Sequence, residues 1–145
     1  MIKDNEKYHG VVFARLTHIN NEIKISSKIN NDNNSYIIND KIGIYVKYSK
    51  KRLTPWLFTF NKEQYSYVKK LILIAKNGYV VLVCNNDGIC CVDFKQFLIV
   101  INKIDNDQTK SINITRYKNQ MYEVSGTDGK INQKVADSMF VFNKQ

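Results

Sequence analysis

The stretch FTFNKEQYSYVKKLILIAKNGYVVLVC, residues 58–84, contains three structural signals in one unbroken run. A short aromatic segment comes first, a run with helical spacing follows Asn61, and an apolar segment of strand length ends the stretch. Asn61 and Gln64 have the spacing of a capping box, in which each side chain bonds the backbone amide of the other residue. The stretch therefore predicts a strand, a helix and a second strand.

The segments on both sides of this stretch extend the pattern. Asp87-Gly88 between two apolar runs is a strong hairpin signal, and Asp93 with Gln96 forms a second capping box. The remaining apolar patterns predict helices over 6–21 and 94–104, strands within 22–29, 35–40, 41–49 and 56–60, a hairpin over 111–126 and a short strand over 138–142. We expect one α/β (α+β) domain over residues 1–145, with a mixed β-sheet flanked by about three helices and a C-terminal β-hairpin.

The composition is that of a globular protein with a strong positive charge. The 145 residues include 22 Lys and Arg against 13 Asp and Glu, which gives a net charge of +9. Such an excess attracts polyanions and accelerates their association. The apolar runs are far shorter than the roughly 18 residues of a membrane span, and the start MIKDNEKYHG has no apolar core of a secretion signal. We therefore expect a cytoplasmic protein without a membrane partner.

The cysteines and histidines do not form a recognisable site in the sequence. Cys84, Cys90 and Cys91 lie on apolar runs without zinc-ligand spacing, so we expect small buried hydrophobic residues. His9 and His18 are nine residues apart on one predicted helix and point about 180° away from each other. We expect both histidines at the surface or at its boundary.

The stretch GIYVKYSKKRLTPW, residues 43–56, combines basic and aromatic residues and contains no carboxylate. Cations bind phosphates, and aromatic rings provide planes on which bases stack. The pattern therefore predicts a nucleic-acid-binding segment, with Lys69, Lys70, Arg116 and Lys118 as possible extensions of it. Its predicted contacts are Tyr45, Lys47, Tyr48, Lys50, Lys51, Arg52 and Trp56.

The order of elements over about residues 5–94 resembles the restriction-endonuclease-like, PD-(D/E)XK, superfamily. The segment IIND ends in Asp40, and IYVKYS is similar to the family strand that carries the catalytic lysine, here Lys47. Residues 58–84 are similar to the strand, helix and strand that follow in archaeal Holliday-junction resolvases of this fold. The resemblance implies a Mg²⁺ site that uses Asp40, with Glu6 of the first helix as a second ligand, and Lys47 beside the phosphate.

This sequence departs from the family pattern at one position that matters for catalysis. Tyr45 stands two residues before Lys47, where the family has an acidic metal ligand. We therefore expect a nucleic-acid-binding protein of nuclease-like fold without a full catalytic site and without a cofactor. Two alternatives remain open. One is a Mg²⁺-dependent nuclease that uses Asp40 and Lys47, and the other is a small interaction or inhibitor protein of a phage, plasmid or defence locus that binds an acidic protein.

Overall fold

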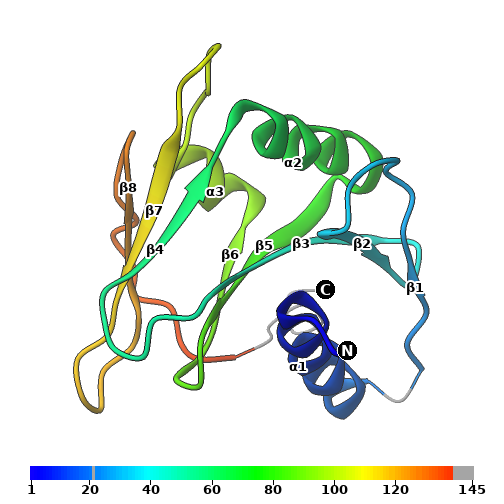
Figure 1. Ribbon diagram of the computed structural model, residues 1–145, viewed down its shortest axis with the longest axis horizontal. Coiled ribbons are helices and arrows are strands. Elements are labelled where there is room, and N and C mark those ends of the chain that lie inside the picture. Colours follow the sequence, from blue (N-terminus) through cyan, green and yellow to red (C-terminus); the bar gives the residue numbers. More distant parts are fainter. Residues whose placement is uncertain (21, 139–145) are drawn as a thin grey trace.

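The computed structural model describes residues 1–20 and 22–138 of the chain, which form three helices and eight strands (Figure 1). Their order is α1 (Asp4–Ile19), β1 (Ile25–Ser26), β2 (Ser35–Ile38), β3 (Ile42–Ser49), β4 (Trp56–Phe60), α2 (Lys62–Ala75), β5 (Asn77–Cys84), β6 (Gly88–Asp93), α3 (Phe94–Val100), β7 (Lys110–Thr115) and β8 (Glu123–Gly126). The predicted strand over 138–142 lies almost entirely outside the described residues.

Five of the strands form a mixed sheet, sheet A, in the order β1-β2-β3-β5-β6. Strands β3 and β5 are parallel and pair along eight residues each, from Ile42 opposite Asn77 to Ser49 opposite Cys84, whereas all other neighbours in sheet A are antiparallel. Strand β5 is buried along nearly its whole length. An almost continuous apolar sequence is expected for a strand that is covered on both faces.

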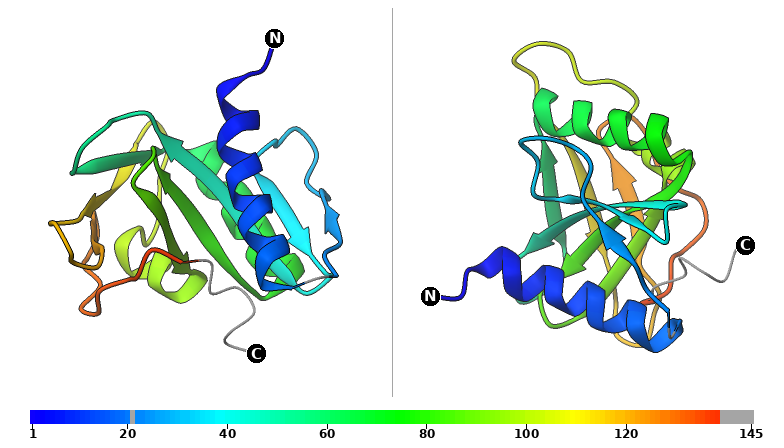
Figure 2. Two further views of the ribbon diagram at one scale, coloured as in Figure 1. Left: turned by 90° about the horizontal axis from the view of Figure 1, so that it is seen from below. Right: turned by 90° about the vertical axis from the view of Figure 1, so that its right-hand side faces the viewer.

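The two faces of sheet A are covered by different elements (Figure 2). Helix α1 packs Val12 and Leu16 against one face, where they join the apolar side chains of β3 and β5. Helix α2 packs Val68 and Leu71 against the other face, which also carries Tyr45. The alternation of β3 was predicted correctly, and it determines which of its side chains meet each helix.

The three remaining strands form a separate antiparallel sheet, sheet B, in the order β4-β7-β8. In β4 the residues alternate strictly, so that Trp56, Phe58 and Phe60 are buried while Leu57 and Thr59 are exposed. The buried side chains join the same core as α2 and α3. The predicted class, a mixed sheet flanked by three helices with a C-terminal hairpin, is confirmed, but the aromatic strand β4 pairs with that hairpin and not with sheet A.

Both predicted capping boxes are present at the starts of α2 and α3. Asn77-Gly78 is a residue pair expected at a helix C-cap, but the chain already turns at Lys76, with φ 65°, and β5 begins directly at Asn77. Gly78 is required by close packing at this point. A Cβ atom there would collide with the backbone oxygen of Gly43 on β3 and would lie 2.6 Å from Cζ of Phe94.

The ends of the other helices also differ from the predictions. Helix α1 spans Asp4–Ile19 instead of 6–21, and α3 stops at Val100 instead of continuing to residue 104. In α1, His9 is buried together with Val12 and Leu16, whereas Ile19 is exposed. The expectation that His9 lies at the surface is therefore wrong, whereas His18 is exposed as expected.

The three cysteines are buried and reduced, as predicted. Burial raises the pKa of the Cys84 and Cys90 thiols, which keeps both in the protonated form. None of the helices in the described part of the chain combines the length and the apolar character needed to cross a membrane.

Candidate nucleic-acid interface

The residues expected to form a metal-dependent catalytic site lie apart. Asp40 is exposed in the turn before β3 and forms an ion pair with Lys24 (3.0 Å), whose hydrogen bond and charge lower the pKa of Asp40. Lys47 lies five residues into β3, which is about 17 Å along the strand from Ile42 beside that turn. Glu6 is on α1, on the opposite face of sheet A from Lys47. The structure thus does not bring Asp40, Lys47 and Glu6 together.

Lys47 connects the two sheets. Its Nζ donates a hydrogen bond to the backbone oxygen of Thr59 on β4, lies 3.5 Å from Oε1 of Gln64 and stands 4.4 Å from the centre of the Phe60 ring. Burial lowers the pKa of Lys47 to about 8. The side chain is thus engaged within the protein, so it is not presented to a phosphate as the sequence had suggested.

Two of the aromatic residues predicted to stack on bases are in the core. Tyr45 is 0% and Trp56 is 2% exposed, and their rings pack near Phe60 and Tyr122, with centroid distances of 6.2 Å in both cases. Neither ring offers a free face to a ligand. Their position follows from strand alternation, since Tyr45 shares a face of β3 with Lys47 and Trp56 belongs to the buried row of β4.

The remaining cations of the predicted segment are at the surface, in the loop between β3 and β4. Lys50 forms an ion pair with Asp4 of α1 (3.0 Å), while Lys51 and Arg52 are exposed and form no ion pair within residues 1–20 and 22–138. The loop is held from inside, because Trp56 Nε1 donates to the backbone oxygen of Lys51 (2.9 Å). It therefore presents its cations from a fixed backbone.

Tyr48, at the end of β3, is half-buried and already has a stacking partner. Its ring lies parallel to that of Tyr8 on α1, with centroids 4.5 Å apart and an interplanar angle of 12°. Tyr8 in turn donates to Oδ1 of Asn85, just after β5 (3.1 Å). These contacts place the start of α1 at the carboxyl ends of the parallel strands β3 and β5, the position at which open α/β sheets bind ligands.

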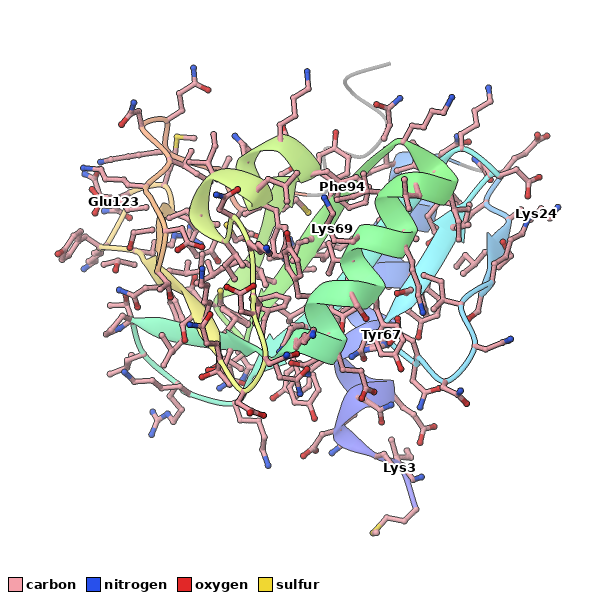
Figure 3. All side chains as sticks on the ribbon, turned by 90° about the horizontal axis from the view of Figure 1, so that it is seen from above. Lys3, Lys24, Tyr67, Lys69, Phe94 and Glu123 are labelled. Carbon is pink, nitrogen blue, oxygen red and sulfur yellow. The ribbon has the colours of Figure 1, made fainter. Side chains whose placement is uncertain are left out.

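The start of α1 adds two lysines that the sequence pattern did not connect with the loop, and the carboxylates of Asp4 and Glu6 lie in the same turn. Lys3 and Lys7 are exposed in the same turn as Asp4, the partner of Lys50. Figure 3 shows Lys3 where this end of α1 projects from the molecule, far from Lys24 and Glu123. Because more than 40 residues separate the two groups, only the fold reveals their proximity. We call the resulting surface the basic edge: Lys3, Lys7, Tyr48, Lys50, Lys51 and Arg52.

The basic edge gains no free cation from Lys69, Lys70 or Arg116, which the sequence had suggested as extensions. Lys69 and Lys70 lie on α2, across sheet A from α1. Arg116 is held by Asp87 (3.0 Å), and the neighbouring Asp137 accepts hydrogen bonds from Arg15 (2.6 Å) and from the backbone amide of Ile89 (2.8 Å). Arg116 is therefore part of an internal ion-pair network.

Comparisons of the chain with protein families, curated proteins and solved structures found no match. The likeness to the restriction-endonuclease-like superfamily thus stays a hypothesis based on the order of elements. In the described part of the chain, no three His, Cys, Asp or Glu side chains come together as a group that could hold a metal ion.

Proposed function

We propose that this protein binds nucleic acid through the basic edge. The observation that carries the proposal is the pair Lys51 and Arg52, which are exposed on an anchored loop and are not neutralised by a carboxylate of the described chain. Phosphate groups are the complementary ligands for such cations. Lys50 belongs to the same loop, but its charge is partly balanced by Asp4.

The proposed contacts favour recognition of the phosphate backbone over recognition of bases. Tyr45 and Trp56 are buried and Tyr48 is stacked on Tyr8, so the basic edge has no free aromatic platform among the residues predicted for one. Contacts of cations with phosphates carry no sequence information. We therefore expect binding that depends weakly on sequence and strongly on salt.

The proposal contains no catalytic step. Cleavage by the mechanism that the resemblance implies requires Asp40 and a second carboxylate around one metal ion. Asp40 is instead paired with Lys24 at the far end of β3 from the basic edge. Binding without cleavage is the function that this arrangement favours.

Fluorescence anisotropy with labelled 20-nucleotide single-stranded DNA, single-stranded RNA and duplex DNA tests the proposal. If three cations contact phosphates of duplex DNA, affinity should fall about 40-fold between 50 and 200 mM salt. The double substitution Lys51→Ala with Arg52→Ala should weaken binding at least tenfold and make the salt dependence less steep.

A matched control separates the basic edge from the general charge of the protein. Lys41→Ala with Lys95→Ala also removes two exposed positive charges, one beside the β2–β3 turn and one on α3. This variant should stay within threefold of the wild type. Equal losses in the two double variants, or no salt-sensitive binding to any of the three probes, would contradict the proposed interface.

The same oligonucleotides also test the nuclease alternative. Incubation with Mg²⁺ should leave them intact. Divalent-dependent cleavage that is lost in both Asp40→Ala and Lys47→Ala would show that the two residues act together, and it would replace binding alone as the function.

A further inference from the structure

Helix α2 exposes large apolar side chains on the side turned away from sheet A. Leu73 is 79% and Ile74 is 50% exposed, next to the exposed Lys70. The outer face of a helix that covers a sheet is normally polar, because only the inner stripe is buried. Two adjacent aliphatic residues at the surface therefore need an explanation other than the core.

These residues line a hollow beside α2. The loop before β2 forms its other wall, and the hollow has a volume of about 400 Å³. Tyr67 Oη lies 3.2 Å from the backbone oxygen of Asn31, which ties this loop to the helix. Ile29, from the same loop, reaches into the core below. We call this surface the α2 hollow; it is lined by residues 28–31 of the loop and by Lys70, Leu73 and Ile74 of the helix.

The charges around the α2 hollow are positive. Lys28, Lys69 and Lys70 are exposed and form no ion pair in residues 1–20 and 22–138. Two acidic residues lie nearby, but each is bonded to a hydroxyl group and forms no ion pair with these lysines. Glu63 lies 3.0 Å from the hydroxyl of Tyr67, and Asp32 is buried and accepts a hydrogen bond from Ser35.

We propose that the α2 hollow docks an acidic segment of a partner protein, with an aliphatic or aromatic side chain seated between Leu73, Ile74 and the loop. Carboxylates of that segment would lie beside Lys28 and Lys70, where opposite charge favours encounter and orientation. An apolar anchor in a pocket surrounded by charged residues is a common arrangement at protein interfaces.

Other occupants fit these observations less well. A second copy of this chain would bring like charges together, because its own α2 hollow is positive. A membrane-binding helix presents a broad apolar face, whereas α2 exposes two large aliphatic side chains, Leu73 and Ile74, among lysines. Nucleic acid gains little from aliphatic walls, since bases bind by stacking on aromatic rings.

The α2 hollow is separate from the basic edge. Helix α2 lies on one side of sheet A, and α1, which contributes to the basic edge, lies on the other (Figure 1). Figure 3 shows Lys69 at the flank of α2 nearer α3, and Lys3 at the far end of the molecule. Failure of one proposal would therefore leave the other standing.

The test uses the full chain and a fluorescein-labelled 12-residue peptide of glutamates with leucines spaced three and four residues apart. We expect saturable binding in the micromolar range. Leu73→Ser with Ile74→Ser, which changes no charge, should weaken binding at least fivefold, and so should Lys28→Gln with Lys70→Gln. In ¹H–¹⁵N spectra the peptide should shift amides of residues 28–31 and 67–76.

Two controls make the result specific. Val11→Ser with Ile99→Ser removes two exposed aliphatic residues on α1 and α3 and should change peptide affinity less than twofold. The same peptide with serine in place of leucine should bind at least fivefold more weakly than the original. DNA binding by Leu73→Ser with Ile74→Ser should equal that of the wild type.

Four outcomes would overturn the proposal. They are the absence of saturable peptide binding, amide shifts outside the two segments, self-association of the wild type that Leu73→Ser with Ile74→Ser abolishes, and binding to phosphatidylglycerol vesicles that the same variant abolishes. The last two would assign the surface to a second copy and to a lipid bilayer, respectively.

Discussion

Strand β3 and the loop that follows it contain the same kinds of residue but differ in how far their side chains are exposed. Lys47 lies in β3 with its Nζ over the Phe60 ring and bonded to Thr59, whereas Lys51, four residues later, is exposed and has no carboxylate partner in the described chain. The composition of the segment predicts a basic surface throughout. Alternation along the strand and the packing of β4 decide that only the loop forms such a surface.

The difference teaches that a basic aromatic segment has to be divided by burial before it is given a function. Tyr45 and Trp56 flank the loop in sequence but belong to the core, where Trp56 fixes the loop backbone through Lys51. The buried Trp56 thus fixes the backbone of the exposed loop.

The largest effect is expected from Gly78→Ala, next to β3. The new methyl group would collide with the backbone oxygen of Gly43 and with the Phe94 ring, and backbone cannot move aside at low cost. We expect a loss of about 3 kcal/mol in the free energy of unfolding and a fall of about 10 °C in Tm. Thermal and urea unfolding measure it.

Gly10→Ala is the matched control for Gly78→Ala. Gly10 lies within α1, and a Cβ atom there meets nothing within 4 Å. The change should stabilise the protein by up to about 1 kcal/mol, because alanine favours the helix. Similar Tm values for the two variants would show that the contact between β3 and β5 is not as close as described.

Lys47 should give the protein a stability that rises with pH. Burial lowers its pKa from 10.5 to about 8 in the folded state. Between these two values the unfolded chain binds more protons than the folded protein, so the free energy of unfolding increases with pH. We expect a gain of about 1 kcal/mol between pH 7.5 and 9 in the wild type relative to Lys47→Met, measured by urea unfolding.

Lys51→Met provides the comparison within the same segment. Since Lys51 is exposed, this variant should follow the pH dependence of the wild type. If the free energies of unfolding of Lys47→Met and Lys51→Met change with pH in the same way, burial of the Lys47 charge is not what distinguishes the strand from the loop.

Helix α1 also carries one buried and one exposed residue of the same type, His9 and His18. Burial lowers the pKa of His9 from 6.5, and the charge of Asp32 only partly opposes this. As the pH falls below 6.5, His9 therefore binds a proton in the unfolded chain before it does so in the folded protein. The free energy of unfolding then decreases, by about 1.4 kcal/mol for each pH unit between the two pKa values of His9.

Replacement of each histidine by glutamine separates their contributions. Unfolding curves at pH 7 and pH 5 should show a smaller acid sensitivity in His9→Gln and no change in His18→Gln, because His18 is exposed. An unchanged acid sensitivity in His9→Gln would assign the effect to carboxylates instead.

The smallest effect on stability is expected from Lys51→Ala with Arg52→Ala. Exposed side chains without partners contribute little to folding, so the free energy of unfolding should change by less than about 0.5 kcal/mol. The same variant should show the largest loss in nucleic-acid binding. A decrease in Tm of several degrees would mean that the loop contributes to the core and that the binding data need a different control.

Local patterns predicted much of the fold. The capping boxes at Asn61 and Asp93, the hairpin at Asp87-Gly88 and the two faces of β3 were all recognisable, because each depends on neighbours within a few residues. The pairing of β4 with β7 was not recognisable. The paired residues of the two strands are at least 50 positions apart, and the alternation of β4 fits an edge of either sheet.

The candidate site was predictable only in part for the same reason. The exposed loop follows from its polar sequence, but Lys3 and Lys7 join it through the ion pair between Asp4 and Lys50, which no local pattern indicates. Asp40 and Lys47 are seven residues apart, an odd spacing that would put them on opposite faces of an unbroken strand, and Asp40 is in addition paired with Lys24.

The carboxylate of Asp137 has a consequence for the way the chain can fold. It receives Arg15 from the first helix and the amide of Ile89 from the middle of the sequence, and Gly88 leaves the space that it fills. A ribosome-bound chain that has not yet emerged as far as residue 137 cannot make this three-way junction. The chain thus reaches its native stability only after Asp137 has emerged from the ribosome.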